Sequence, residues 1–219
     1  MSNRPSSINL ITWTASTLLL APLLVLCVRY LDVPLANYVK NHLFANPDWS
    51  QMTSDLPDLL LQVVLLTTFA ALSLYLVRAK KGVYDATTRM AQLVTWAAPT
   101  SYLVKSLLKF VFGRVNTRLW LQEPGLYGFH WFQRRHGCDG FPSGHMVVIV
   151  TLLAALWRFH PKSRPVCLLV GLSLGVALIA TDYHFLSDVI AGAYVGVVVE
   201  AIMFRLLLRE PENSRNSSL

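Results

Sequence analysis

Long apolar runs alternate along the chain with short polar or charged stretches. The uncharged run from Ile8 to Val28 has the length that a helix needs to cross the hydrocarbon core of a bilayer, about 20 residues at 1.5 Å each. Five further apolar segments follow it, and the third span carries Lys105 and Lys109 near its far end. The pattern predicts an all-α, polytopic membrane protein, a six-transmembrane-helix bundle with spans at about 8–28, 57–77, 90–112, 143–159, 166–183 and 188–208.

The segment from Asp32 to Asp58, between the first two spans, is mixed in character. Its apolar residues Leu35, Tyr38 and Val39 have helical spacing, so it could be a helix lying along the membrane interface or a plain loop. The sequence has no internal repeat and no domain boundary, which predicts a single transmembrane domain over 1–219 with a polar tail at 210–219.

Small residues one helical turn apart occur in the last two spans, as Gly171 with Gly175 and as Gly192 with Gly196. Such spacing lets helix backbones approach closely in a membrane. It predicts tight contacts between these spans and their neighbours.

Composition agrees with a membrane protein. Of the 219 residues, 54% are hydrophobic and 14% are charged, and the mean hydropathy is +0.46, whereas a soluble domain carries about a quarter charged residues. Lysine and arginine outnumber the acidic residues by 19 to 12, but they lie in short loops between apolar runs, which argues against a nucleic-acid partner. The three cysteines do not form a paired disulfide framework.

The basic residues predict the topology. The loops after the second and fourth spans carry Arg78, Lys80, Lys162 and Arg164, which places these loops and both termini in the cytoplasm. The outward loop Gly113 to Pro142 breaks the rule, because it holds four arginines. They are Arg114, Arg118, Arg134 and Arg135. A cationic outer loop is explained if it binds an anionic ligand.

The fourth span starts with a pattern that suits an anion. Pro142 and Ser143 are typical helix-start residues, and Ser143 is the expected N-cap. The first backbone N–H groups of such a helix point outward, Gly144 allows close approach, and the helix dipole favours negative charge. His145, at the rim of a span, needs a polar partner or a chemical task.

A second histidine lies at the same predicted membrane face. His184 and Asp188 are four residues apart, which on a helix lets the carboxylate accept the imidazole N–H and leaves the other ring nitrogen free to attack. A structural His–Asp pair is the alternative. Together with His145, the pattern favours a nucleophile and a general acid, and Lys109 with Arg114 or Arg118 would supply cations for a phosphoryl group.

These motifs resemble those of the phosphatidic acid phosphatase type 2 superfamily of membrane lipid phosphatases, over roughly 109–196. The resemblance implies that His184 is the nucleophile that forms a phosphohistidine, that Asp188 orients it, and that His145 is the general acid. It also implies that Ser143, Gly144 and Lys109 hold the phosphate, and that no metal ion or other cofactor takes part.

Two family arginines are absent from this sequence. The first block should have arginine and proline where Asn116 and Thr117 stand, and Arg114 or Arg118 is the candidate replacement. The third block should have arginine where Leu178 stands, and Arg134 or Arg135 is the candidate there. Asp182, next to the motif, has no family counterpart.

The sequence therefore predicts an integral membrane phosphatase that hydrolyses a lipid phosphate or lipid diphosphate at the outer face of the membrane. The expected location is a bacterial inner membrane with the site facing the periplasm, and the expected partners are the lipid substrate and membrane lipids. A lipid phosphotransferase using the same residues and a non-catalytic lipid-phosphate-binding protein are the alternatives.

Overall fold

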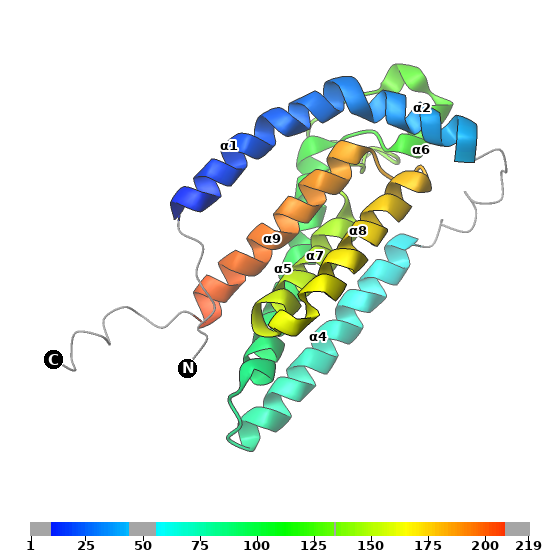
Figure 1. The fold of residues 1–219 in the computed structure, drawn as a ribbon. Coiled ribbons are helices and arrows are strands. Elements are labelled where there is room, and N and C mark those ends of the chain that lie inside the picture. The colour runs from blue at the N-terminus through cyan, green and yellow to red at the C-terminus, as the bar shows by residue number, and fades with distance from the viewer. Residues whose placement is uncertain (1–9, 44–55, 134, 209–219) are drawn as a thin grey trace.

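The computed structural model describes residues 10–43, 56–133 and 135–208 (Figure 1). Within these ranges the regular elements are helices, apart from an isolated bridge between Arg114 and Phe129, so the predicted all-α class is confirmed. The α-helices are α1 (Leu10–Leu26), α2 (Asp32–Leu43), α4 (Leu56–Lys80), α5 (Ala86–Phe112), α6 (Thr117–Gln122), α7 (Gly144–Phe159), α8 (Arg164–Ala180) and α9 (Leu186–Leu208).

Long apolar helices lie at the predicted spans. In the described ranges, four stretches are long and apolar enough to cross a membrane: Thr14–His42, Leu59–Lys80, Pro161–Ala180 and Leu186–Leu208. Helix α7 is apolar but has 16 residues, and α5 has 27 residues with two lysines near its end. Lipid-facing residues such as Leu66 (69% exposed) and Phe69 (72% exposed) are what a bilayer would cover.

The fifth predicted span, 166–183, is shifted in the structure. Helix α8 begins at Arg164 and ends at Ala180, with Thr181 as its C-cap. Asp182 follows with a positive φ of 49°, a left-handed conformation that stops a helix. The chain reverses direction here, so residues 181–185 form a loop that carries His184 instead of another helical turn.

The N-terminal helix does not stop where the first span was predicted to end. Helix α1 passes through a π-helical turn, Cys27–Leu31, directly into α2. Of the two interpretations of the following segment, a helix is therefore correct for 32–43, and 44–55 lies outside the described residues. In Figure 1, α2 extends across the upper end of the bundle, close to α6.

Helix α7 lies inside the bundle, between α5, α8 and α9 (Figure 1). A Cβ atom added to Gly192 would stand 2.6 Å from the Ser143 carbonyl oxygen, and one added to Gly196 would stand 2.7 Å from the Val147 carbonyl oxygen. These distances are shorter than any normal contact of a Cβ atom. The predicted close approach at Gly192 and Gly196 is confirmed, and it places the start of α9 against the start of α7.

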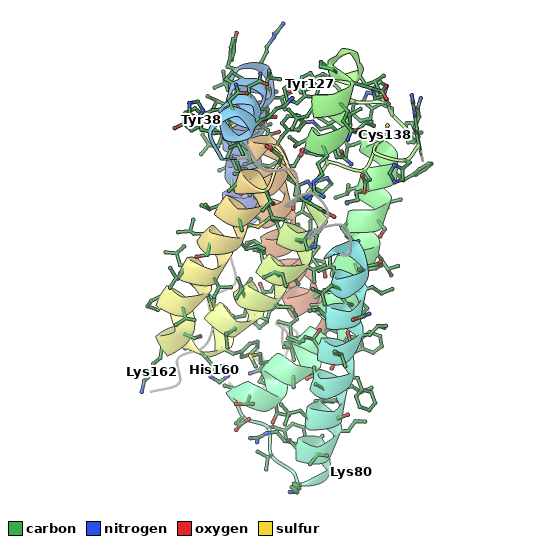
Figure 2. All side chains as sticks on the ribbon, turned by 90° about the vertical axis from the view of Figure 1, so that its right-hand side faces the viewer. Tyr38, Lys80, Tyr127, Cys138, His160 and Lys162 are labelled. Carbon is green, nitrogen blue, oxygen red and sulfur yellow. The ribbon has the colours of Figure 1, made fainter. Side chains whose placement is uncertain are left out.

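The two ends of the bundle differ in their chemistry. Figure 2 shows Lys80, His160 and Lys162 at one end and Tyr38, Tyr127 and Cys138 at the other. The predicted cytoplasmic loops therefore share one end, while the arginine-containing segment 113–142 occupies the opposite end. Arg134, the chain termini with their arginines and the tail 210–219 lie outside the described residues.

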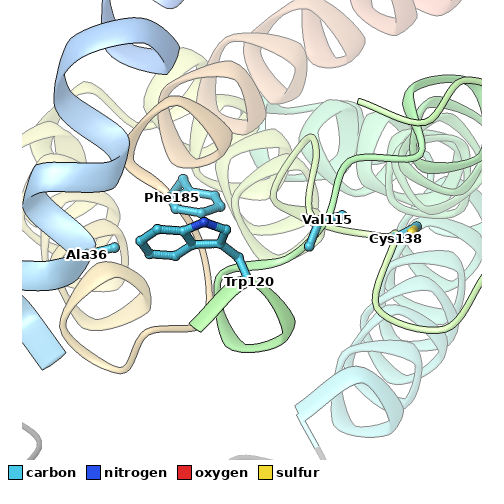
Figure 3. Close-up of a cluster of buried hydrophobic side chains, with 5 residues drawn as sticks. All are labelled: Ala36, Val115, Trp120, Cys138 and Phe185. Atoms are coloured by element: carbon cyan, nitrogen blue, oxygen red, sulfur yellow. The ribbon is translucent and has the colours of Figure 1, made fainter. Parts of the chain in front are cut away.

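A buried aromatic cluster holds this second end together (Figure 3). Ala36 of α2, Trp120 of α6 and Phe185 before α9 meet there, and the ring centroids of Trp120 and Phe185 are 5.6 Å apart. Val115 and Cys138 complete the buried core of the cluster. Because Phe185 is 1% exposed, the cluster fixes the backbone immediately after His184.

Candidate active site

The start of α7 forms the predicted cap. Ser143 is the N-cap, it is fully buried, and its hydroxyl oxygen accepts a hydrogen bond from the Met146 N–H at 3.5 Å. The Ser143 N–H in turn donates to the Asp188 carbonyl oxygen at 3.0 Å, which ties this cap to the first turn of α9. The positive end of the α7 dipole therefore lies beside the His184–Asp188 segment.

Two lysine side chains from α5 lie against Gly144. A Cβ atom placed on Gly144 would be 2.8 Å from Lys105 Cδ and 3.5 Å from Lys109 Cε, so glycine leaves the space through which both chains pass. Lys109 was predicted to bind phosphate, whereas Lys105 was given no role. Lys105 could have been predicted from its position four residues before Lys109, because this spacing places both side chains on one face of α5. The two cations and the helix N-terminus together create a positive seat.

An aspartate that the sequence analysis missed also lies here. Asp139 Oδ2 is 3.5 Å from Lys109 Nζ, and Asp139 Oδ1 accepts from the Asn116 amide at 3.2 Å. Burial alone would raise the pKa of Asp139, but Lys109 and Asn116 outweigh it and lower the pKa, so the carboxylate is charged. Lys109, Asp139 and Arg135 border a cavity of about 320 Å³.

His184 is buried at 3% exposure in the loop before α9. Its Nδ1 atom is 3.7 Å from Asp188 Oδ2, which is within ion-pair range but too long for the predicted hydrogen bond. Asp188 Oδ2 accepts instead from the Phe185 N–H at 3.0 Å, since α9 begins only at Leu186 and Asp188 caps its first turn. Among the described residues, neither imidazole nitrogen has a hydrogen-bond partner.

Burial also sets the charge of His184. Removal from water lowers the pKa of the imidazole, and the nearby Asp188 carboxylate opposes this shift without cancelling it. The ring is therefore neutral at neutral pH. A neutral imidazole whose Nδ1 faces a carboxylate leaves Nε2 with the lone pair that a nucleophile needs.

The other oxygen of Asp188 belongs to a buried ionic network. Arg114 donates from Nη1 to Asp188 Oδ1 at 2.6 Å and from Nη2 to Asp32 Oδ2 at 2.7 Å. Ser187 accepts from the same Nη1 at 2.6 Å, and its backbone N–H donates to Asp32 Oδ1 at 3.0 Å. The Arg114 side chain is 0% exposed. Arg114 thus acts on the site through Asp188, and no motif in the sequence pointed to Asp32, which comes from the N-terminal part of the chain.

Tyr183 joins three of the predicted site residues. Its ring centroid is 5.5 Å from that of His145 and 5.1 Å from that of His184, so both imidazoles lie against one aromatic ring. The Arg118 guanidinium carbon lies 4.8 Å from the same ring centroid, and Arg118 also donates to the Thr181 carbonyl oxygen at 3.4 Å. Arg118 therefore lies against the same Tyr183 ring that both histidines contact.

The two family positions that lack arginine have other tasks. Asn116 is the N-cap of α6, where its side-chain oxygen accepts from the Leu119 N–H at 2.8 Å. Leu178 is 4% exposed and packs in an apolar cluster with Met146 and Val189. In the part of the chain that the structure describes, no group of three or more histidine, cysteine or acidic residues could hold a metal ion.

The fold and the candidate site define a helical membrane protein that has two histidines beside a cationic helix end. A model of the PAP2 superfamily matches residues 90–211, more than half of the chain, so the chain belongs to the PAP2 superfamily. The family resemblance read from the sequence is confirmed.

Two curated relatives are similar to parts of the chain. A "Lipid A 1-phosphatase" of Rhizobium johnstonii is 30% identical over 107 residues, which are 48% of this chain and 43% of the relative. A "Lipid A 1-phosphatase" of Rhizobium etli is 30% identical over 96 residues, 44% of this chain and 41% of the relative. The chain thus matches less than half the length of these relatives. No solved structure matches it significantly.

Proposed function

We propose that the protein hydrolyses a lipid phosphate or lipid diphosphate, with His184 as the nucleophile. The observation that carries this proposal is the state of His184, a buried imidazole whose nitrogens have no hydrogen-bond partner among the described residues and whose Nδ1 faces Asp188. A buried polar ring of this kind is costly unless it has a task. The family membership and the names of the two relatives support the same chemistry.

In the first step, Nε2 of His184 attacks the terminal phosphorus. The bond from this phosphorus to its leaving oxygen breaks, which is the lipid oxygen in a lipid phosphate and the bridging oxygen in a lipid diphosphate. His145 donates its proton to that leaving oxygen, and the phosphoryl group remains on His184. In the second step, His145 takes a proton from a water molecule, whose oxygen attacks phosphorus and breaks the phosphorus–nitrogen bond. Inorganic phosphate leaves, and both histidines return to their starting state.

The phosphoryl oxygens would lie at the positive seat formed by the start of α7 and the α5 lysines. Ser143 and Gly144 supply the helix N-terminus, Lys109 and Lys105 supply charge, and Arg118 adds a cation beside Tyr183. Arg114 would hold Asp188 and so fix the orientation of the catalytic segment. No metal or cofactor has a part in this scheme.

For the membrane arrangement, we propose a single domain over 1–219 that crosses the bilayer six times, with α5 and α7 as two of the spans. The basic loops would lie in the cytoplasm together with both termini, and the site would face the periplasm of a bacterial inner membrane. The test is labelling of Glu123→Cys and Lys162→Cys, both exposed positions, with an impermeant maleimide on intact spheroplasts. Labelling of the second variant in preference to the first contradicts the orientation.

The activity is tested by phosphate release from lipid A 1-phosphate, phosphatidic acid, phosphatidylglycerol phosphate and undecaprenyl diphosphate in detergent micelles. Wild type is compared with His184→Gln, His145→Gln and the control His160→Gln at the opposite end of the bundle. We expect release to fall by at least about 10³-fold in the first two variants and to persist in the control.

Release that survives His184→Gln rejects the nucleophile. The alternatives give distinct results in the same assay. Transfer of the phosphoryl group to a second lipid without free phosphate identifies a phosphotransferase, and binding of the lipids without any turnover identifies a lipid-phosphate binder. A phosphohistidine is expected as an acid-labile, base-stable label on the wild-type protein and not on His184→Gln.

A further inference from the structure

A second cavity, of about 540 Å³, lies away from the histidines among α7, α8 and α9. Its walls are mainly aliphatic side chains and small residues from the three helices. They include Met146, Val150, Leu153, Leu168, Leu172 and Val197. We call this cavity the α7–α9 groove. None of the chemistry described above uses it.

The groove opens sideways from the bundle. Leu168 and Leu172 line the groove and are nevertheless 56% and 61% exposed. Trp157, which also lines it, is 40% exposed. Figure 1 shows α8 and α9 standing on either side of α7. In a membrane, a groove of this kind meets the hydrocarbon chains of the bilayer, so its natural contents are apolar chains.

One end of the groove is next to the candidate active site. Met146, which lines it, directly follows His145 in the first turn of α7. From Met146 to Trp157 the groove follows α7 over about 16 Å at 1.5 Å per residue. That is about half of the roughly 30 Å hydrocarbon core, the depth of one leaflet. A lipid whose phosphate is at His184 would have its chains in this leaflet.

An ion pair lines the other end of the groove. Arg158 donates from Nη2 to Glu200 Oε2 at 2.7 Å, its Nε bonds to the other carboxylate oxygen, and both residues line the groove. The two side chains are 12% and 2% exposed. A hydrocarbon chain that extended past this ion pair would remove the remaining solvation of the two charged groups, which is unfavourable. The pair therefore limits the length of chain that the groove holds.

We propose that the α7–α9 groove binds one hydrocarbon chain of the lipid substrate while the phosphate of the same molecule lies at the histidines. This inference rests on the proposed function, because it assigns the tail of the lipid whose head group the site would hydrolyse. The position of Met146 beside His145 in the first turn of α7, the aliphatic walls and the length of one leaflet identify the occupant as a chain of this lipid.

Filling the groove tests the proposal. Gly171 lines it, and a Cβ atom there would meet only ordinary contact, 3.7 Å from Leu153 Cδ1, so Gly171→Leu places a side chain inside without a backbone clash. The matched control is Ser173→Leu, an exposed position on the same helix that does not line the groove. Both variants are assayed with dihexanoyl and dioleoyl phosphatidic acid in mixed micelles.

We expect Gly171→Leu to lower kcat/KM for the dioleoyl lipid at least about tenfold and to leave that for the dihexanoyl lipid within about twofold, because short chains bury little surface. Ser173→Leu should change neither value. Equal losses on both lipids in Gly171→Leu, or no loss on either, would overturn the proposal. A loss of the same size in Ser173→Leu would do so too, since it would indicate an effect of the bilayer-facing surface.

A binding measurement separates failure of the groove from failure of the proposed function. The His184→Gln variant is placed in phosphatidylcholine vesicles that contain a small fraction of phosphatidic acid with brominated chains, which quench tryptophan fluorescence. The quenching of Trp157 is obtained by subtracting the signal of the same protein with Trp157→Phe. Quenching should saturate at a low fraction and disappear with Gly171→Leu. If quenching instead rises in proportion to the fraction of brominated phosphatidic acid, the contacts are random. That result rejects binding in the groove even if phosphate is released. Wild type that releases no phosphate rejects the proposed function, while the quenching still decides on the groove.

Discussion

Asp32 and Arg114, which are 82 positions apart in the chain, form an ion pair from which solvent is excluded. The two side chains are 0% exposed and their closest oxygen and nitrogen are 2.7 Å apart. Arg114 is also hydrogen-bonded to Asp188, whose other carboxylate oxygen is 3.7 Å from His184 Nδ1. Asp32 lies outside the 90–211 region that the superfamily model matches, so the N-terminal helix adds a carboxylate to the support of the candidate active site.

Removing this carboxylate should destabilise the protein strongly. Asp32→Ala removes one of the two carboxylates that Arg114 binds and the acceptor of the Ser187 N–H, and loss of one member of a buried pair typically costs about 3–5 kcal/mol. The measurement is unfolding of detergent-solubilised protein by sodium dodecyl sulfate. The control is Arg78→Gln, which removes an ion pair with Asp85 at the exposed α4–α5 turn and should have a far smaller effect. Similar losses in both variants would contradict the role of the buried pair.

The two arginines of the outer segment should behave differently when each is changed to glutamine. Arg118→Gln should raise KM for a lipid phosphate about tenfold with little change in thermal stability, because Arg118 is half-buried beside Tyr183. Arg114→Gln should lower the melting temperature markedly, because it leaves two buried carboxylates unpaired. KM and the melting temperature are measured for both variants. A melting temperature lowered mainly by Arg118→Gln, or a KM raised mainly by Arg114→Gln, would refute the roles assigned to the two arginines.

Lys105 should contribute to anion binding, as we propose for Lys109. Both side chains pass Gly144, so Lys105→Met and Lys109→Met should each weaken inhibition by inorganic vanadate about tenfold, or roughly 1.4 kcal/mol. Lys162→Met, at the opposite end of the bundle, is the control and should leave the inhibition constant unchanged. An unchanged constant in Lys105→Met would mean that its ammonium group does not reach the bound anion.

The contact between α7 and α9 predicts the outcome of a small substitution. Gly192→Ala would place a methyl group 2.6 Å from the Ser143 carbonyl oxygen, so α9 must move away from the capped start of α7. We expect lower thermal stability and at least a tenfold loss of kcat, despite the better helix propensity of alanine. Gly171→Ala, where the new methyl meets only a 3.7 Å contact, should retain activity and stability. Full activity in Gly192→Ala would disprove the need for this close approach.

Asp182 should give the protein a pH-dependent stability. Burial raises the pKa of Asp182 from 3.8 to about 6, against the opposing effects of Arg118 and Lys40. Because the pKa of Asp182 is higher in the folded than in the unfolded state, the protonated carboxyl group favours the folded state. This contribution to stability is complete below about pH 3.8 and is lost as the pH rises through about 6. The melting temperature of Asp182→Asn should therefore exceed that of wild type at pH 8, and the difference should shrink toward pH 4.

The control for this prediction is Asp85→Asn. The Thr88 backbone N–H, which Asp85 caps, and Arg78 lower the pKa of Asp85, so this carboxylate stays charged from pH 5 to pH 8. The difference in melting temperature between Asp85→Asn and wild type should hence be constant over that range. A pH dependence shared by both variants would point to a cause other than Asp182.

Local signals in the sequence predicted the all-helical class and two local features beside the candidate site. The N-cap at Ser143 and the small residues Gly192 and Gly196 follow from rules about neighbouring residues, and the structure contains them. The boundary of α8 was wrong by three residues, because the left-handed Asp182 ends the helix and its side chain gives only a weak signal for that conformation.

Residues brought in by long-range contacts could not be predicted in this way. Asp32 and Asp139 reach the site only because separate segments fold against one another, and the same holds for the contact of Tyr183 with His145. The hydrogen bond predicted between His184 and Asp188 assumed that both lie on one helix, whereas His184 precedes α9. Spacing within a sequence fixes which residues can share a helix face, but it does not fix where the helix starts.

The uninterrupted course of α1 through the π-helical turn into α2 connects an apolar helix to the candidate active site. A helix tilts when the thickness of the surrounding membrane changes. Asp32 is the first residue of α2, so tilting of α1 would move this carboxylate relative to Arg114. We therefore expect the thickness of the surrounding membrane to affect the alignment of the proposed nucleophile.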